Sequence, residues 1–323
     1  INYQNLVKMK LIEFSKRFPD EASCEEYLKN HREKVGVVCK RCGGHQQIWD
    51  KYNKCWICKK CGHKTTLTAD TVMHNSKLPL MYWFTAIHLL TSTRKTFSAL
   101  EMQRQLGHKR YQPIWEMMHK LRSVMGQRDT TYQLSESIEL DEAFFSTENS
   151  DETKKQEKRK AGAGSQRKSK VLVMIESKAV PENKQKKGKK DRKSGHIKMK
   201  VVPDVQACTV TEVSKVAVAA DSRIITDDSR SHTKLKGYFK EVYPIKTLPE
   251  QASKILPWVH TAISNAKSLL LDMYHGIKDE FLQSYLDEFC WKFNRRSFGD
   301  RLFDRLLVAA MSYRPMFQHR IYD

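Results

Sequence analysis

Two aspartates and one asparagine are spaced along this chain in a way that suits metal-dependent chemistry on phosphate groups. Asp141 ends the apolar run Ile138-Glu-Leu-Asp141, and Asp227 ends a second run, Ile224-Ile-Thr-Asp227. Asn265 lies 38 residues after Asp227, in a segment with a helical pattern. Phosphoryl transfer of the two-metal type needs oxygen ligands that converge on two Mg²⁺ ions roughly 4 Å apart. Aspartate supplies such oxygens, and the carbonyl of asparagine supplies them more weakly.

The elements that would position these side chains are two strands and a helix. An Asp within a central strand and an Asp just past a neighbouring strand would meet at one edge of the sheet, and a later helix would bring Asn265. Other interpretations stay open. Glu139 and Glu142 compete with Asp141, although side-chain alternation puts Glu139 on the face of Asp141 and makes Glu142 the weaker rival. Asp227 could simply cap a turn, and Asn265 could be a helix cap.

Four of the eight cysteines form two Cys-x-x-Cys pairs, and each pair is followed directly by a glycine. In a basic chain without the layout of a secreted protein, this spacing is typical of metal binding rather than of disulfides. Four thiolates form the closed tetrahedral set of a structural Zn²⁺, which leaves no open position for catalysis. Cys55 and Cys58 are an alternative second pair, but the glycine after Cys61 favours the later one. The expected zinc ligands are Cys39, Cys42, Cys58 and Cys61.

The chain has 58 Lys and Arg residues against 37 Asp and Glu residues, a formal net charge of +21 that is spread over its length. Lys and Arg displace condensed counterions from phosphate backbones, so a nucleic acid is the expected partner. A merely basic protein and a binder of acidic membranes are the alternatives. No apolar run approaches the roughly 20 residues that span a bilayer, and the first residues lack the layout of a signal peptide. We therefore expect no membrane partner and a cytoplasmic location.

The hydrophobic pattern predicts a multidomain chain of the α+β and α/β classes. Residues 10–34 are expected to form an amphipathic helix, residues 35–72 a zinc ribbon, and residues 76–128 three helices. Residues 135–312 have the pattern of an α/β domain. Its expected strands are 137–145, 170–177, 197–203, 223–226 and 242–247, and its expected helices are 211–220, 262–275, 279–294 and 298–311.

Two polar segments interrupt the predicted sheet. Residues 147–169 are rich in Lys, Glu, Ser and Gly, and residues 182–196 contain a lysine-rich run. Low hydrophobicity and high charge predict mobile loops for both. The lysine-rich segment is equally consistent with a solubilising loop and with a loop that contacts phosphates.

The three helices expected within residues 76–128 resemble a helix-turn-helix unit. Ser98-Ala-Leu-Glu101 has the sequence of a capping box, and Gly107 suits the end of the second helix. In such a unit the last helix enters the major groove of DNA. A plain helical spacer has the same apolar stripe and remains an alternative. The exposed face of the last helix would carry Gln112, Glu116, His119, Lys120 and Ser123, with Lys109, Arg110 and Arg122 near phosphates.

Beyond these separate motifs, nearly the whole chain resembles the insertion-sequence 1595 family of DDE/N transposases. The ribbon and the helix Trp115-Glu-Met-Met-His-Lys-Leu-Arg122 are similar to that family. The resemblance implies a zinc ribbon, a helix-turn-helix unit and an RNase H-like catalytic domain, which is a mixed sheet with flanking helices. Four further motifs occur in the order of the family: Ile138-Glu-Leu-Asp141-Glu-Ala-Phe-Phe, Ile225-Thr-Asp227, His260-Thr-Ala-Ile-Ser-Asn265, and Tyr285-Leu-Asp-Glu-Phe289 followed by Phe293-Asn-Arg-Arg296.

By this resemblance, Asp141, Asp227 and Asn265 are the ligands of two Mg²⁺ or Mn²⁺ ions. Many relatives have Glu at the third position and part of the family has Asn, so Asn265 is within the range of the family. Relatives with Glu often have a Lys two turns further along the helix. Asp272 stands there in this chain, and Lys267 is a candidate replacement.

The same resemblance implies a DNA transposase that binds terminal inverted repeats on double-stranded DNA. It would cleave strands at the element ends and join the freed 3′-hydroxyl to target DNA. A homodimer on DNA is expected because two ends are paired, and the location would be the nucleoid of a prokaryotic cytoplasm. The alternative from another class is a non-catalytic zinc-ribbon and helix-turn-helix regulator, or a decayed transposase. Further candidate contacts to the DNA backbone are Lys267, Arg295 and Arg296.

An amide in place of a carboxylate keeps an oxygen ligand and removes one negative charge. We therefore hypothesise that the free protein binds its metal ions weakly. A DNA phosphate would restore the missing charge, so that metal binding would depend on the substrate.

Overall fold

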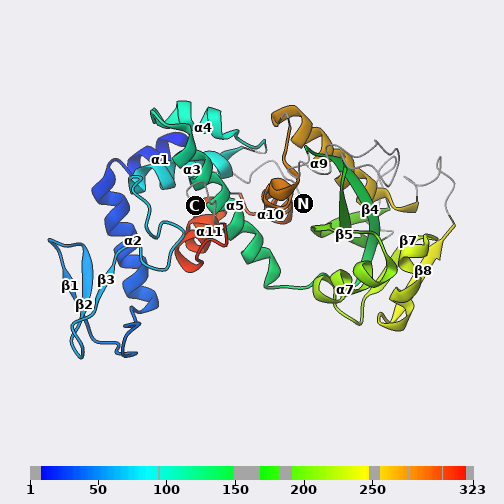
Figure 1. The fold of residues 1–323 in the computed structure, drawn as a ribbon, viewed down its shortest axis with the longest axis horizontal. Coiled ribbons are helices and arrows are strands. Elements are labelled where there is room, and N and C mark those ends of the chain that lie inside the picture. Colours follow the sequence, from blue (N-terminus) through cyan, green and yellow to red (C-terminus); the bar gives the residue numbers. More distant parts are fainter. Residues whose placement is uncertain are drawn as a thin grey trace. The chain divides into compact units, whose positions relative to one another are not determined.

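Figure 1 shows the fold of the chain in a computed structural model, which describes residues 9–93, 95–148, 168–181, 191–246, 255–274, 276–299 and 301–317. The chain forms two compact units. One comprises Ile1–Met125 together with Ser297–Asp323, and the other comprises Gly126–Arg296. This division differs from the expected boundaries, because the last helix groups with the N-terminal unit and not with the α/β domain expected over residues 135–312.

The N-terminal segment forms two helices, α1 (Leu11–Arg17) and α2 (Glu21–Val35), in place of the single helix expected over residues 10–34. Pro19 separates them, because a proline disfavours the helical conformation of the residue before it. Phe18 accordingly has a φ of −130° and a ψ of 75°. Asp20 then caps α2, since its side chain accepts the backbone N–H of Ser23 at 2.8 Å.

The cysteine-rich segment forms a three-stranded antiparallel sheet of β1 (Gln47–Asp50), β2 (Cys55–Cys58) and β3 (Lys64–Thr66). α2 is attached to this sheet through Arg32, whose guanidinium lies 5.0 Å from the ring centroid of Trp56. The same guanidinium donates hydrogen bonds of 3.2, 2.7 and 2.8 Å to the carbonyls of Thr66, Leu67 and Ala69. The N-terminal helices and the small sheet therefore pack together within the first unit.

Three helices follow, as expected: α3 (Leu80–Ser92), α4 (Ala99–Leu106) and α5 (Tyr111–Thr130). The Ser98 hydroxyl accepts the backbone N–H of Glu101 at 3.0 Å and caps α4. α4 ends at Gly107, whose φ of 64° is in the left-handed region that glycine adopts without strain. α11 (Arg301–Ser312) packs against α3, and its Phe303 ring contacts that of Phe14 on α1 at 5.8 Å. The C-terminal helix thus completes the core of the first unit.

The second unit is built on a five-stranded mixed sheet in the order β6-β5-β4-β7-β8. β4 (Ser137–Ser146), β5 (Lys168–Ala179) and β6 (Arg192–Val202) are antiparallel neighbours, whereas β7 (Arg223–Asp227) and β8 (Glu241–Ile245) run parallel to β4. All five expected strands are present. The ends of the two expected loops, 168–169 and 192–196, belong to strands β5 and β6 instead, while 149–167 and 182–190 lie outside the described residues.

Helices cover both faces of this sheet (Figure 1). α7 (Ala207–Ala217) and the 3₁₀ helix η4 (Arg230–Gly237) pack on the face that carries Ile138 and Leu140. α9 (Pro257–Met273) and α10 (Leu282–Asn294), the latter preceded by the short η5 (Asp279–Phe281), pack on the face that carries Ala143 and Phe145. The result is the expected mixed α/β architecture. Within the part of the chain that the structure describes, every helix is too short or too polar to span a bilayer.

Candidate functional site

The two aspartates predicted as metal ligands lie next to each other on neighbouring parallel strands. β4 and β7 pair in register up to Leu140 and Thr226, and Asp141 and Asp227 are the next residue on each strand. Asp141 is inside β4, which continues to Ser146, whereas Asp227 is the last residue of β7. The carboxyl end of β7 and the middle of β4 therefore form one site.

The environment of Asp141 is unfavourable for a negative charge. Its side chain is only 16% exposed. Burial, and next the charge of Asp227, raise the pKa of Asp141 to about 7, although the backbone N–H of Glu142 donates to Oδ1 at 2.8 Å and opposes this shift. A divalent cation between the two carboxylates would remove their repulsion, so the pair fits a metal with a preference for oxygen ligands.

A buried histidine joins Asp227 to a second carboxylate. His232 lies in η4, directly after β7, and its side chain is 2% exposed. Its Nδ1 is 2.9 Å from Asp227 Oδ1, and its Nε2 is 3.1 Å from Glu142 Oε1. Burial lowers the pKa of His232, but the contacts with Asp227 and Glu142 outweigh burial and raise this pKa to about 9. The contact with His232 in turn lowers the pKa of Asp227.

Glu142, Asp227 and His232 also qualify as a metal-binding group, because one donor atom from each lies within 4.8 Å of the other two. A set with one imidazole nitrogen suits Mn²⁺ or Zn²⁺ better than Mg²⁺. The sequence pattern made Glu142 a weaker candidate ligand than Asp141, and the Glu142 side chain lies on the face of β4 opposite to that of Asp141. No motif or spacing marked His232, which follows Asp227 by five residues.

Glu139, the other rival of Asp141, connects β4 to α9. It is 1% exposed, and its Oε2 accepts the backbone N–H groups of Trp258 and Val259 at 2.8 and 2.9 Å. The first N–H groups of a helix have no partner inside the helix, and a carboxylate there also interacts favourably with the helix dipole. Glu139 therefore anchors the start of the helix that carries Asn265.

Asn265, the expected third ligand, is exposed on α9. Among the described residues, no hydrogen bond or ion pair joins it to Asp141 or Asp227. The α9 residue that reaches the aspartates is His260, whose Nδ1 is 3.7 Å from Asp141 Oδ2. Burial lowers the pKa of His260, although the charges of Glu139 and Asp227 oppose this shift. The structure thus brings the two aspartates together, whereas Asn265 on the adjacent helix has no hydrogen bond or ion pair to them among the described residues.

The basic residues expected on DNA in this unit differ in exposure. Lys267 is partly buried on α9, whereas Arg296 is exposed, with its guanidinium 2.6 Å from the carbonyl oxygen of Ser194. Arg295 is only 8% exposed and forms an ion pair of 2.6 Å with the buried Asp129. Arg295 was expected to contact phosphate, but in the structure its charge is paired in the interior.

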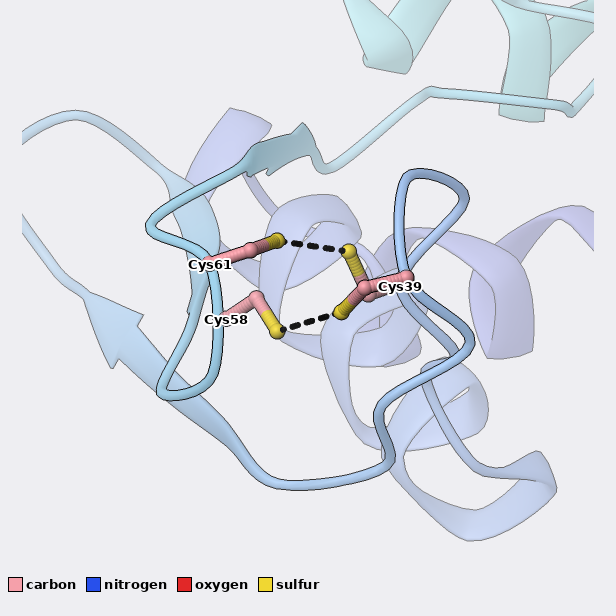
Figure 2. Close-up of side chains that lie close together, drawn as sticks. Cys39, Cys58 and Cys61 are labelled. Carbon is pink, nitrogen blue, oxygen red and sulfur yellow. Dashed lines mark hydrogen bonds between the residues drawn. The ribbon is translucent and has the colours of Figure 1, made fainter.

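The two Cys-x-x-Cys pairs converge in the first unit, as Figure 2 shows. Cys39 Sγ is 3.5 Å from Cys61 Sγ, Cys42 Sγ is 3.5 Å from Cys58 Sγ, and the four sulfur atoms lie within 4.8 Å of one another. Neighbouring sulfurs of a tetrahedral zinc site with bonds of about 2.3 Å are about 3.8 Å apart, so the set fits Zn²⁺. The rival Cys55 is on β2 and outside the cluster.

The backbone forms the same kind of turn at both Cys-x-x-Cys pairs. The N–H of Gly43 donates to the carbonyl of Cys39 at 2.8 Å, and the N–H of Gly62 donates to the carbonyl of Cys58 at 2.9 Å. Both glycines have a φ of 68°, which is costly for other residues. The turns thus hold the thiols in place, as expected of a structural metal site.

Two side chains of α5, the helix expected to read DNA, are buried although they were expected at its exposed face or near phosphates. His119 and Arg122 are 0% and 1% exposed, and an Arg122 guanidinium nitrogen is 3.4 Å from the carbonyl oxygen of Phe97. The expected position of His119 on the exposed face is therefore wrong, and Arg122, which was expected near phosphates, is buried as well, because both side chains belong to the core. The expected contacts that are exposed or partly exposed are Lys109, Arg110, Gln112 and Lys120.

Comparison with known families identifies the second unit. Residues 133–294, half of the chain, match a family model described as the ISXO2-like transposase domain, from the insertion-sequence 1595 group. The matched segment starts just before β4 and ends with α10, so it includes both aspartates and α9. No curated protein and no solved structure matches the chain.

Proposed function

Because the chain belongs to the insertion-sequence 1595 family of transposases, we propose that it cleaves DNA at the ends of a mobile element and joins them to target DNA. The observation that carries this proposal is the juxtaposition of Asp141 and Asp227. Burial and the second carboxylate raise the pKa of Asp141 to about 7, and carboxylates with pKa values shifted in this way cluster at functional sites. Family membership implies a DNA substrate.

The second unit is consistent with an RNase H-like catalytic domain. Three antiparallel strands are extended by two parallel ones, and helices lie on both faces. Asp141 is on the central strand and Asp227 is on its parallel neighbour. Such a domain would hold its metal ions between these two positions, with α9 beside them.

In the proposed reaction, Asp141 and Asp227 would hold two Mg²⁺ or Mn²⁺ ions, and the Asn265 carbonyl would add an uncharged ligand. When bound, such ions stabilise the attacking and the leaving oxygen atoms. A water oxygen attacks the phosphorus at the element end, the bond from phosphorus to the 3′-oxygen breaks, and a 3′-hydroxyl is released. That 3′-oxygen then attacks a phosphorus of the target strand and displaces the 3′-oxygen bonded to it.

The first unit would recognise the terminal inverted repeats. α3, α4 and α5 would act as a helix-turn-helix, and the zinc cluster would keep the ribbon folded. Lys77, Arg110 and Lys120 line one hollow of about 390 Å³ beside α5, and such convergent cations suit a DNA phosphate. Since the reaction pairs two ends, we expect a homodimer on DNA.

Strand cleavage tests the proposal. The full chain, with Mg²⁺ or Mn²⁺ and labelled duplex DNA that carries the element's own ends, should nick or join strands. Asp227→Ala should abolish cleavage and preserve DNA binding, whereas Asp221→Ala, an exposed residue before β7, should preserve both. Full activity of Asp141→Ala and Asp227→Ala would overturn the catalytic assignment. Binding of these ends without cleavage by the unaltered chain would indicate a regulator.

A further inference from the structure

Asp227 needs support from other groups if its carboxylate is to keep one orientation. It is the last residue of β7, and 39% of its side chain is exposed. β7 pairs with β4 up to Thr226 and with β8 up to Asp227, and η4 begins at Arg230. A side chain at this position loses rotational freedom when a neighbouring group holds it, so the ligand can be oriented before a metal binds.

His232 is placed to hold this carboxylate. The 3₁₀ turn brings it back to the end of β7, with its backbone N–H 3.1 Å from the carbonyl oxygen of Ser229. Its Nδ1 lies 2.9 Å from Asp227 Oδ1 and 2.5 Å from the hydroxyl oxygen of Thr226. Because the imidazole is buried, these contacts are shielded from water and the ring cannot turn freely.

Glu142 connects His232 to the other aspartate. Its side chain lies 3.1 Å from His232 Nε2, while its backbone N–H donates to Asp141 Oδ1 at 2.8 Å. Side chains alternate along a strand, so the Glu142 side chain points to the face of η4 and that of Asp141 to the face of α9. Glu142 therefore donates a backbone hydrogen bond to Asp141 and contacts His232, which forms an ion-pair contact with Asp227.

We propose that His232 is a positioning residue which, together with Glu142, fixes the Asp227 carboxylate for metal binding. The inference rests on the proposed function, in which Asp227 is a metal ligand. In this proposal His232 acts through Asp227 and does not coordinate a metal ion itself. Groups that orient a metal ligand in this way typically contribute roughly 10- to 100-fold to metal affinity or activity.

Two substitutions of His232 separate positioning from packing. The amide nitrogen of His232→Asn lies near the place of Nδ1 and can still donate to Asp227, whereas that of His232→Gln extends toward Glu142. Both variants lose the ring, so similar decreases in melting temperature are expected. The measurements are Mn²⁺ affinity of the full chain by electron paramagnetic resonance, and kcat and KM for DNA cleavage.

We expect His232→Gln to lower Mn²⁺ affinity and kcat roughly 10- to 100-fold, without a change in the KM for DNA. His232→Asn should retain most of both quantities. Glu142→Gln should cause a smaller loss, and this loss should not add to that of His232→Gln, because both act through the same contact.

Several results would overturn the proposal. Equal losses in both His232 variants, in proportion to their melting temperatures, would show a packing role. Coupling of bound Mn²⁺ to the nitrogen of His232 would make this residue a ligand. If the chain binds Mn²⁺ in a way that depends on Asp227 but does not cleave DNA, only the proposed function is overturned. The Mn²⁺ affinities of the His232 variants would then still test the positioning role of His232. Without any Asp227-dependent site, both proposals fail.

Discussion

The carboxylate of Glu139 on β4 accepts the backbone N–H of Trp258 in the first turn of α9 over 2.8 Å. The same oxygen accepts the N–H of Val259 at 2.9 Å. One buried acidic side chain thus joins the strand that carries Asp141 to the helix that carries Asn265. The dipole of α9 stabilises the negative charge at this position.

Replacement of Glu139 should detach the start of α9. Glu139→Ala is expected to lower the free energy of unfolding of the second unit by about 2–4 kcal/mol, because two hydrogen bonds to a charged group are lost in the interior. Glu139→Gln, which keeps an acceptor, should cost less. Denaturant unfolding provides the measurement. The control is Glu212→Ala, which removes an exposed ion pair with Lys215 and should cost below about 1 kcal/mol. Equal losses at both positions would contradict the role of Glu139.

Metal binding should strengthen as the pH rises toward 7, because the pKa of Asp141 is raised to about 7. Below this value the carboxyl group must release its proton before it binds a cation, so Mn²⁺ affinity should change by up to about tenfold per pH unit and then level off. Stability has the opposite dependence. The folded state binds this proton more tightly than the unfolded state, so the contribution of Asp141 to stability falls as the pH rises from about 4 to about 7.

Asp227→Asn tests the cause of this shift. Burial, the larger cause, remains in the variant, and the charge of Asp227 is removed. The pKa of Asp141, followed by carbon-13 NMR of its carboxyl group, should therefore decrease but stay above its usual value. An unchanged titration would show that the two carboxylates do not interact.

Zinc is expected at one ion per chain, bound by the four clustered cysteines. Cys39→Ser should lower the zinc content and expose the ribbon to proteolysis, because such small metal domains depend on the ion for folding. Cys55→Ser is the matched control, since Cys55 is buried on β2 and outside the cluster. Elemental analysis and limited trypsin digestion provide the measurements. Loss of zinc in the control variant would contradict the assignment of Cys58 and Cys61 as the second pair.

Two arginines of the first unit should respond differently to substitution. Arg110 is exposed, so Arg110→Ala should weaken DNA binding and reduce the slope of log affinity against log salt by about 1. Arg122 is 1% exposed, so Arg122→Ala should lower the free energy of unfolding by about 2 kcal/mol or more and leave the salt dependence unchanged. Fluorescence anisotropy at several salt concentrations measures binding. A reduced slope in Arg122→Ala would show that its charge reaches DNA.

Asn265→Glu is expected to increase Mn²⁺ affinity in the absence of DNA, because it would add a negative ligand to the proposed site of Asp141 and Asp227. The gain should be smaller with DNA bound, since a phosphate then supplies charge in both proteins. Calorimetric titration with and without duplex DNA provides the measurement. Equal Mn²⁺ affinities of the two free proteins would contradict the hypothesis that metal binding depends on the substrate.

The strands, the three central helices and the zinc cluster could be predicted from local patterns. Apolar alternation, the Ser98 cap, Gly107 and the spacing of the Cys-x-x-Cys pairs each act within a few residues, so their signals are present in short stretches of sequence. Pro19, which splits the first helix, is also a local signal, because a proline disfavours the helical conformation of the residue before it. The proximity of Asp141 and Asp227 was expected from one position within a strand and one at the end of its neighbour, together with the family resemblance.

Contacts between distant parts of the chain decided the remaining features. Helical periodicity assigned Arg122 to the surface, but this side chain is buried in the core of the first unit. Arg295 is likewise buried, and it forms an ion pair with Asp129. The link from Glu142 to His232 joins residues 90 positions apart, and no local pattern specifies it. Local spacing can therefore predict which residues are able to bind metal, whereas burial and the pairing of charges in the folded chain determine which of them hold one another in place.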